Sequence, residues 1–472
     1  MMAAKTISVF ILLVLSARAL AQPLWAEDRQ VGYFSEGVSS AGPGFPNIDA
    51  LYGESDDLFV AMVEHSTTTE GDRLYVSKSS NNGIDWTLRK AITGGNNNII
   101  SPSIVRIPGT ELLLTAVITQ FPNGQCFVDT YRHNSNSLVY KGHSVADFSY
   151  PGAGEPVSCT LLENIPGGEV WAFAVDDNNT LFLTRSGDGI TWSSSIPVAA
   201  NAVRPQAEVS SDGHVAVTWI QPGTGKIFCA VADRYGSFGS AVQVSGSADA
   251  SASPSVAWEH VGDKVLGIVW HNNQNQCLLS MSTDNGLTWS TPESFGEGFY
   301  PCIDRFHGKR RIGACYTKEN GDILVAKSVM LSGLPSGNFS VRNTHSAYTG
   351  GYSIVKYGAT TSQLALFFVS EDEKHIWYNS ENWTGTEEEN SGTYGLSVSV
   401  SPNPAGSIAN LSSSGGTGPA RYRIYSADGR LAEEAVSVQN QFTLDTSELP
   451  PGMYLVTCEK EGMTASCRMV RF

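Results

Sequence analysis

Short runs of β-branched and aromatic residues recur along the chain, and none of them shows the period of a helix. The most apolar runs are Leu58–Val63, Glu111–Ile118, Glu169–Val175, His214–Ile220, Lys264–Trp270, Arg311–Tyr316 and Gln363–Val369. Turn-forming residues separate these runs, and bounded runs of this kind predict buried β-strands. One further strand is expected before each run and two after it. The first of the two that follow is expected at Lys226–Ala232 in one unit and at Gln276–Ser282 in another.

The units that contain these runs begin at a recurring position, which in most of them is a proline. The starts are Phe45-Pro46, Ser101-Pro102, Glu155-Pro156, Arg204-Pro205, Ser253-Pro254, Tyr300-Pro301 and Gly351-Tyr352, so that successive units span 47–56 residues. Self-similarity at this period, with four short strands in each unit, predicts small sheets arranged in a ring. We therefore expect an all-β fold with a seven-bladed β-propeller over residues 22–384. A six-bladed propeller is the alternative, because the third unit begins in an irregular Gly/Pro stretch.

The last unit lacks a fourth strand of its own. Its third strand is expected at Ile376–Ser380, and the acidic residues Glu387–Asn390 that follow indicate a linker over residues 385–393. The strand-like segment Glu27–Ser35 precedes the first unit and belongs to none. We predict that it completes the last blade, which closes the ring and removes an exposed sheet edge. A linear solenoid is the alternative, but it would need capping repeats.

One turn motif marks three of the units. In Ser282–Trp289, Ser282 and Asp284 can bind turn N–H groups, Gly286 permits a positive φ, and Trp289 covers the hairpin with a large apolar surface. Looser copies contain Asp188 with Trp192, and Trp86. The motif resembles the Asp-box, or BNR repeat, and residues 45–384 resemble the sialidase-like Asp-box superfamily.

That resemblance implies a propeller scaffold and does not by itself imply a reaction. Sialidases of this superfamily have six blades, and use three arginines, a Tyr–Glu nucleophile pair and an Asp acid/base. The segment Val105-Arg106-Ile107-Pro108 contains an arginine in a matching motif, but Arg106 falls at the far end of its inner strand. The sialidase catalytic set is therefore not found.

After Gly392 the composition changes, and about 80 residues of alternating pattern and turn signals predict a small β-sandwich. The segments Ser401–Pro404, Tyr422–Arg430 and Leu449–Val456 resemble, in order, the type A C-terminal sorting domain of type IX secretion, over residues 394–472. The resemblance implies the type IX secretion machinery as partner. It also implies a final location that is secreted or on the outer cell surface, reached via the periplasm. An ordinary fibronectin-like accessory module is the alternative.

The N-terminus reads as a signal peptide over residues 1–21. Lys5 precedes the apolar run Thr6–Ala17, and Ala19-Leu20-Ala21 fits the small-residue cleavage rule. A membrane anchor is the alternative, but the run is short for that, and no later segment could span a bilayer. The formal charge of −16 argues against nucleic acid as partner.

The eight cysteines offer two pairs with hairpin spacing. Cys302 and Cys315 flank a turn at 307–310, and Cys458 and Cys467 flank Gly462-Met463. Each pair could be a cross-strand disulfide or two buried thiols. No Cys/His cluster has zinc spacing and no Gly-rich phosphate loop occurs, so neither a metal nor a cofactor is expected.

Loops at one face of the propeller collect acids, arginines and tyrosines, which suit a glycan or another extracellular polymer. The candidate ligand-binding residues are Arg204, Tyr300, Arg305 and Tyr352. The candidate catalytic carboxylates are Asp49, Glu64, Asp304 and Glu371. We expect a secreted or surface binding protein. The alternative is a sialidase-like glycoside hydrolase that uses two of these carboxylates.

Overall fold

The computed structural model divides into two compact units, Met1–Asn382 and Trp383–Phe472, and each is described by itself. It describes residues 28–34, 37–38, 48–53, 57–66, 71–146, 148, 156–246, 250, 252–259, 264–305, 312–337, 339–357, 363–380, 397–401, 407–414, 419–426, 430–437, 441–447, 449–460 and 463–471. The predicted signal peptide and linker lie outside these residues. Within them, no helix is long and apolar enough to cross a membrane.

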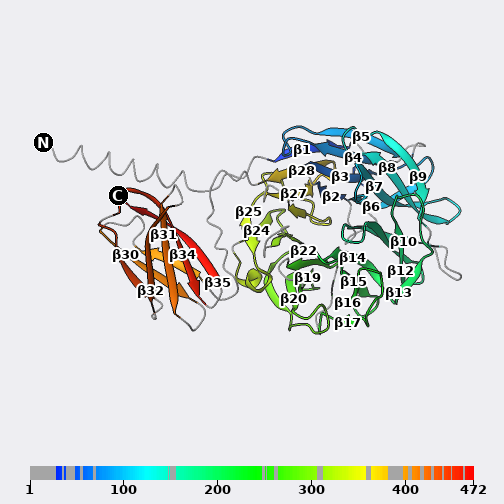
Figure 1. Ribbon diagram of the computed structural model, residues 1–472. Coiled ribbons are helices and arrows are strands. Elements are labelled where there is room, and N and C mark those ends of the chain that lie inside the picture. Colours follow the sequence, from blue (N-terminus) through cyan, green and yellow to red (C-terminus); the bar gives the residue numbers. More distant parts are fainter. Residues whose placement is uncertain are drawn as a thin grey trace. The chain divides into compact units, whose positions relative to one another are not determined.

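The first unit consists of four-stranded antiparallel sheets that follow one another around a ring (Figure 1). We name these sheets blades 1 to 7 in chain order, and the first strand of each blade lies nearest the centre. Blade 1 contains β2 (Ile48–Tyr52), β3 (Leu58–Glu64), β4 (Arg73–Ser79) and β5 (Thr87–Thr93); blade 2 contains β6 (Asn98–Arg106), β7 (Leu112–Gln120), β8 (Cys126–Asn134) and β9 (Tyr140–Val145). Blade 3 contains β10 (Pro156–Asn164), β11 (Glu169–Asp176), β12 (Thr180–Ser186) and β13 (Ile196–Ala200); blade 4 contains β14 (Val203–Val209), β15 (Val215–Gln221), β16 (Lys226–Ala232) and β17 (Val242–Gln243).

The second half of the ring repeats this arrangement. Blade 5 contains β18 (Ser255–Glu259), β19 (Val265–His271), β20 (Gln276–Ser282) and β21 (Glu293–Glu297); blade 6 contains β22 (Phe299–Arg305), β23 (Ile312–Thr317), β24 (Ile323–Val329) and β25 (Ser340–Val341). Blade 7 contains β26 (Ile354–Tyr357), β27 (Leu364–Val369), β28 (His375–Ser380) and β1 (Arg29–Tyr33). A 3-10 helix, η1 (Leu331–Ser336), precedes β25. The prediction of an all-β propeller is confirmed.

The N-terminal strand closes the ring as predicted. Strand β1 pairs antiparallel with β28, with Arg29 opposite Tyr378 and Tyr33 opposite His375. Figure 1 shows the blue β1 beside β28, at the point where the two ends of the propeller chain meet. The outer strand of blade 7 thus comes from the opposite end of the unit.

The second strand of each blade is buried along most of its length, because each sheet packs between two neighbouring blades. All residues of β3 and of β27 are buried. This packing explains why these strands read as continuous apolar runs rather than as alternating ones. One such interface joins blades 4 and 5, where Ala216 and Ile220 lie in the same apolar cluster as Trp258 and Trp270.

The Asp-box forms the hairpin between the third and fourth strands of its blade. In blade 5, Oγ of Ser282 accepts a hydrogen bond from the backbone N of Gly286 (2.8 Å), and Oδ1 of Asp284 accepts one from Thr288 N (2.9 Å). Nε1 of Trp289 donates to the carbonyl of Gly286 (3.2 Å). The Ser, Asp and Trp of the motif therefore fix one turn. In the shorter motif of blade 3, Nε1 of Trp192 donates instead to Ser144 Oγ of blade 2 (3.2 Å).

The second unit is a small sandwich of two sheets, as predicted. One sheet contains β29 (Ser397–Ser401), β30 (Ile408–Ser414) and β33 (Gln441–Asp445); the other contains β32 (Leu431–Ser437), β31 (Ala420–Ser426), β34 (Gly452–Lys460) and β35 (Met463–Arg471). Apolar residues of both sheets, such as Leu411 and Val456, share one core. Oη of Tyr422 donates to Oγ of Ser413 (2.8 Å), which adds a polar link between the sheets.

The predicted placement of Cys458 opposite Cys467 is wrong, whereas the alternative of two buried thiols agrees with the structure. Strands β34 and β35 pair Lys460 with Met463, so Cys458 lies opposite Ala465 and Cys467 lies opposite Val456. The register is shifted by two residues from the one that a Gly462-Met463 loop would give. Both cysteines are buried thiols in the core of the sandwich.

Candidate functional site

The innermost strands of all blades enclose a central cavity of about 400 Å³. Its walls come from β2, β6, β10, β14, β18, β22 and β26, which is why residues far apart in the sequence meet there. Apolar side chains alternate in these walls with a small set of charged and polar ones. A cavity of this size, largely preformed and with few polar groups, fits the general description of a ligand site.

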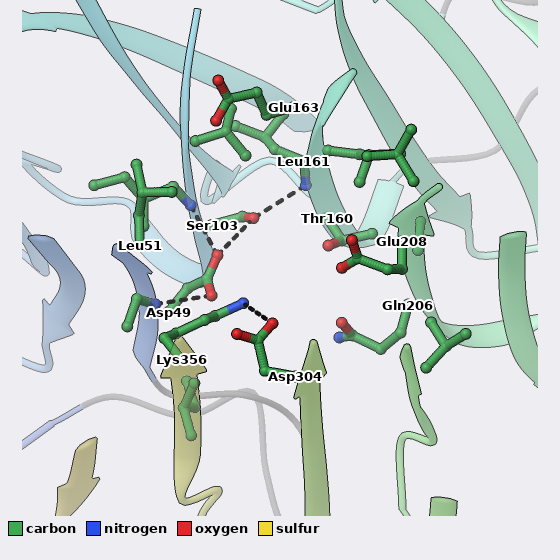
Figure 2. Close-up of a pocket in the computed structure, with 18 of the residues that line it drawn as sticks. Asp49, Leu51, Ser103, Thr160, Leu161, Glu163, Gln206, Glu208, Asp304 and Lys356 are labelled. Carbon is green, nitrogen blue, oxygen red and sulfur yellow. Dashed lines mark hydrogen bonds and ion pairs between the residues drawn. The ribbon is translucent and has the colours of Figure 1, made fainter. Parts of the chain in front are cut away.

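Two carboxylates and one ammonium group converge in this cavity, and a third carboxylate lies elsewhere on its wall. Figure 2 shows the side chain of Lys356 reaching between Asp49 and Asp304, with Glu208 on another part of the wall. Nζ of Lys356 lies 3.9 Å from Oδ1 of Asp304. Burial lowers the pKa of Lys356, but the attraction of Asp304, Asp49 and Glu208 is stronger and raises it above the ordinary value. Lys356 is therefore a fixed cation in this cavity.

Asp49 and Asp304 both bind the backbone of the next blade. Oδ2 of Asp49 accepts hydrogen bonds from Oγ of Ser103 (3.0 Å) and from the backbone N of Ile104 (2.9 Å), both on β6. Oδ2 of Asp304 accepts one from the backbone N of Tyr357 on β26 (2.7 Å). Burial raises the pKa of Asp49, although Lys356 and these hydrogen bonds oppose the shift. Both predicted carboxylates line the cavity, and both also join adjacent inner strands.

Glu208 and Arg305 form the least satisfied polar pair of the cavity. Oε1 of Glu208 lies 3.6 Å from Nε of Arg305, which is longer than a hydrogen bond. Arg305 is only 6% exposed, yet its Nε and Nη1 have no hydrogen-bond acceptor among the described residues. Burial raises the pKa of Glu208, with Arg305 opposing the shift. The pair therefore places a buried guanidinium with two such N–H groups beside a carboxylate in the wall of the cavity.

An aromatic cluster lies beside the cavity and contains Tyr300 and Tyr352, two of the predicted ligand-binding residues. Tyr352 lines the cavity, and its ring lies 4.8 Å from that of Tyr300. The backbone N of Tyr300 donates to Nδ1 of His271 (3.1 Å), and burial, with the charge of Arg204, lowers the pKa of His271 to about 4. The imidazole is therefore neutral at pH 7. Tyr300 and Arg204 stand behind the wall and support it.

Three inner strands begin with a bulge that sequence patterns did not reveal. Ser101, Arg204 and Tyr300 each precede a proline and have φ values of 57°, 56° and 48°. At each of them the pairing register shifts, as between Phe299 and Cys302 in blade 6. Positive φ is costly for residues with a Cβ and concentrates at functional sites. These bulges set the direction of Arg204 and Tyr300 beside the cavity.

The structure does not bring Glu64 or Glu371 into the cavity. Glu64 ends β3, where its Oε2 accepts hydrogen bonds from Nη1 of Arg73 (2.9 Å) and Oη of Tyr75 (3.1 Å). Glu371 is exposed after β27, and its backbone N donates to the carbonyl of Ser346 (2.9 Å). The ends of the second strands lie away from the cavity wall, which is built from the first strands and the residues that flank them.

Cys302 and Cys315 lie directly opposite each other on β22 and β23, as their spacing predicts, but both are free thiols. Cys302 lines the cavity, and Sγ of Cys315 donates to the carbonyl of Ser353 (3.4 Å). No group of three or more His, Cys, Asp or Glu side chains in the described part of the chain is placed to hold a metal ion.

Sequence reasoning missed Glu208, Gln206 and Lys356. Asp49, Glu208 and Asp304 each stand three residues after the proline of their unit, at Pro46, Pro205 and Pro301. This shared position in the repeat could have identified Glu208. Lys356 has no such signal, because its unit begins without a proline.

The C-terminal residues 399–470 match the family model of the secretion system C-terminal sorting domain. The match confirms the sorting domain predicted from the sequence, and a domain of this type indicates export to the cell surface or secretion. The comparison of curated protein sequences gives no match to this chain.

Solved structures similar to this chain are β-propellers. The BP39L lectin from Burkholderia pseudomallei is 15% identical, with 72% of this chain and 99% of that chain covered and a TM-score of 0.55. The α-L-arabinofuranosidase Arb93A from Fusarium graminearum is 9% identical, covering 75% and 97%, with a TM-score of 0.47. A mutant NanB sialidase from Streptococcus pneumoniae is 11% identical, covering 77% and 72%, with a TM-score of 0.43. At these identities the lectin supports the fold and nothing finer.

The fold and the C-terminal match define the class of this protein. It is a β-propeller protein with a secretion-system sorting domain at its C-terminus.

Proposed function

We propose that the protein is an exported glycan-binding protein whose ligand occupies the central cavity. The observation that carries the proposal is the Arg305–Glu208 pair, a buried guanidinium with two N–H groups lacking acceptors beside a carboxylate 3.6 Å away. A buried donor without an acceptor costs about 1–3 kcal/mol, so a ligand oxygen placed there gains that amount. A sugar hydroxyl can accept from Arg305 and donate to Glu208 at once.

Other groups of the wall suit the same ligand. The amide of Gln206 has no hydrogen-bond partner among the described residues, and Lys356 is 30% exposed to the cavity. Leu51 and Tyr352 supply apolar surface for the C–H faces of a sugar ring. The lectin of similar fold is consistent with a carbohydrate as the ligand class of this scaffold.

We favour binding over hydrolysis because of how the cavity carboxylates are used. A glycoside hydrolase needs two carboxyl groups that are free to act on a glycosidic bond. Asp49 and Asp304 instead accept hydrogen bonds from the backbone of the next blade. Loss of either carboxylate would remove hydrogen bonds that join adjacent inner strands. We therefore assign Asp49 and Asp304 to the support of the site rather than to catalysis.

The full chain should be tested on a glycan array, followed by calorimetry with the best ligand. We expect Glu208→Gln to weaken binding at least tenfold, since a hydrogen bond to a charged group contributes about 1.5–3 kcal/mol. Gln206→Ala should weaken it less, by about two- to tenfold, since a hydrogen bond between neutral groups contributes about 0.5–1.5 kcal/mol. Glu434→Gln, an exposed carboxylate of the second unit, is the matched control. Equal affinity in both cavity variants would refute the site. Release of reducing sugar by the wild type would favour the hydrolase.

We further propose that the chain travels via the periplasm and is passed by the type IX secretion machinery to the cell surface or the medium. The sorting domain supports this route. A chain lacking Trp383–Phe472 should accumulate in the periplasm of a host with this machinery. Normal surface export of the truncated chain would contradict the assignment.

A further inference from the structure

A second cavity lies at the outer rim of the propeller, between blades 4 and 5. Its volume is about 510 Å³, and it shares no lining residue with the central cavity. One wall is formed by Gln243 at the end of β17 and the residues that follow it to Gly246. The other wall is formed by Gln276 and Leu278 of β20 and by the segment that begins with Trp289 of the Asp-box.

This rim pocket exists because the outer strand of blade 4 is short. Strand β17 has only two residues, whereas β9 of blade 2 has six. Beside β9, Ser144 fills the corresponding space, since its Oγ accepts from Nε1 of Trp192 and donates to the carbonyl of Gly189 (2.9 Å). In blade 1, Trp86 packs against Tyr378, with ring centroids 5.5 Å apart. Trp289 faces a cavity instead.

The indole of Trp289 is held in place by its own turn and by one apolar cluster. Its Nε1 donates to the carbonyl of Gly286 within the Asp-box, and one part of the ring packs on the apolar cluster of blades 4 and 5. The side chain is half-buried and lines the rim pocket. A rigid, partly exposed indole is a suitable platform for stacking against the C–H face of a sugar ring.

The polar groups of the rim pocket are amides and hydroxyls, and none of its lining side chains is ionisable. Gln276 Oε1 accepts from Nδ2 of Asn272 (3.0 Å), which leaves Nε2 of Gln276 without a bond within the described part of the chain. Nε2 of Gln243 donates to the carbonyl of Gly246 (2.7 Å), which leaves its Oε1 similarly unused. One amide donor and one amide acceptor therefore remain in the pocket that Trp289 also lines.

We propose that the rim pocket is a binding site for a neutral saccharide unit, separate from the central cavity. Indole stacking supplies most of the contact area, and the amides of Gln276 and Gln243 distinguish the positions of hydroxyl groups. A charged sugar would lose its hydration in this pocket without meeting an opposite charge. The site thus differs in chemistry from the central cavity, which is lined by Glu208, Arg305 and Lys356.

The test is titration of the full chain with the methyl glycosides of glucose, galactose, mannose, fucose and N-acetylglucosamine, followed by saturation-transfer NMR. At least one should bind. Trp289→Ala and Gln276→Leu should each reduce its affinity tenfold or more. Trp192→Ala removes the equivalent Asp-box indole of blade 3, and Gln274→Leu changes an exposed amide in the turn before β20; both should bind as the wild type does.

Four outcomes would overturn the proposal. The first is that no neutral glycoside binds, and the second is that Trp289→Ala and Gln276→Leu bind the glycoside as tightly as the wild type does. The third is that Trp192→Ala loses as much affinity as Trp289→Ala, and the fourth is that Glu208→Gln loses the same ligand. The last outcome would place the ligand in the central cavity. Gln276→Leu leaves the indole of Trp289 and its hydrogen bond to Gly286 in place. The proposal can therefore still be tested with Gln276→Leu if Trp289→Ala fails to fold.

Discussion

Nδ2 of Asn379 donates a hydrogen bond of 2.6 Å to Oδ1 of Asp28, although the two residues are 351 positions apart in the sequence. The other oxygen of Asp28 accepts from the backbone N of Thr344 (2.6 Å) and of His345 (2.7 Å). The Asp28 side chain is 0% exposed. One buried carboxylate therefore joins the N-terminal segment to β28 and to the connection between blades 6 and 7, where the ring closes.

Replacing Asp28 should open this closure. In Asp28→Asn one acceptor oxygen becomes an NH2 donor, which must face either the N–H groups of Thr344 and His345 or Nδ2 of Asn379. We therefore expect a loss of about 3 kcal/mol in unfolding free energy. Guanidinium denaturation of the full chain, followed by tryptophan fluorescence, measures it. Asp177→Asn, in an exposed turn, is the control. If the two variants are equally stable, Asp28 does not hold the ring closed.

The closure also shows how far the sequence could predict this fold. A missing fourth strand in the last unit and an unassigned strand before the first one were enough to pair β1 with β28. The partners of Asp28 were not predictable, because Asp28 comes to lie beside Thr344 and Asn379 only when the ring is complete. Local patterns define a blade, whereas contacts between blades depend on the geometry of the ring.

The candidate site was predicted in part for the same reason. Asp49 and Asp304 lie on first strands, and every first strand faces the cavity. Glu64 was assigned from its place after an apolar run, but Arg73 on the next strand binds it. The sequence also could not predict strand register to within two residues, as the pairing of β34 with β35 around Cys458 and Cys467 shows.

The Asp-box glycines should matter for contacts between blades more than for the turn itself. Gly83 has a φ of 74°, and a Cβ added there would overlap the ring of Tyr378 in blade 7. Gly95 has a φ of 66°, but a Cβ there meets nothing within 4 Å. Gly95→Ala should therefore report backbone strain alone, about 1 kcal/mol.

Gly83→Ala should lose about 2–3 kcal/mol more than Gly95→Ala, because overpacking at the blade interface adds to the same strain. Thermal unfolding of the two variants side by side gives the difference. Equal losses would mean that Tyr378 moves aside at little cost and that the Asp-box turn does not clamp the neighbouring blade.

The carboxylate of Asp188 should make stability depend on pH in the acid range. Burial alone would raise its pKa, but hydrogen bonds from the backbone N–H groups of Thr191 and Ile190 and from the hydroxyl of Ser186 lower it to about 2. The unfolded chain binds the proton near pH 3.8, whereas the folded chain binds it near pH 2. The stabilisation is therefore complete above pH 3.8 and is lost as the pH falls towards 2.

Asp188→Asn should remove this part of the pH dependence. The difference in unfolding free energy between wild type and variant should be constant above about pH 5 and shrink as the pH falls towards 2. Denaturation midpoints across this range measure it, and Asp177→Asn serves as the control for an exposed carboxylate. A difference that stays constant down to pH 2 would mean that the turn does not hold Asp188 ionised.

His271 should act in the opposite sense, as a group that the folded protein keeps neutral. Its Nδ1 accepts the backbone N–H of Tyr300 (3.1 Å), and burial, aided by Arg204, lowers its pKa from 6.5 to about 4. Between these values the unfolded chain binds a proton that the folded chain does not. Stability contributed through His271 therefore decreases as the pH falls from 6.5 to about 4, by about 3 kcal/mol in total, and changes little below pH 4.

NMR titration of the His271 ring tests this directly, and we expect a midpoint near pH 4 with the proton on Nε2 above it. The stability of His271→Gln should lose the decrease between pH 6.5 and 4, whereas His214→Gln, a partly exposed histidine of blade 4, should keep it. A midpoint near 6.5 would mean that water reaches the ring. The hydrogen bond to Tyr300 would then break on protonation, and the aromatic wall that Tyr300 and Tyr352 form beside the central cavity would loosen in mildly acid surroundings.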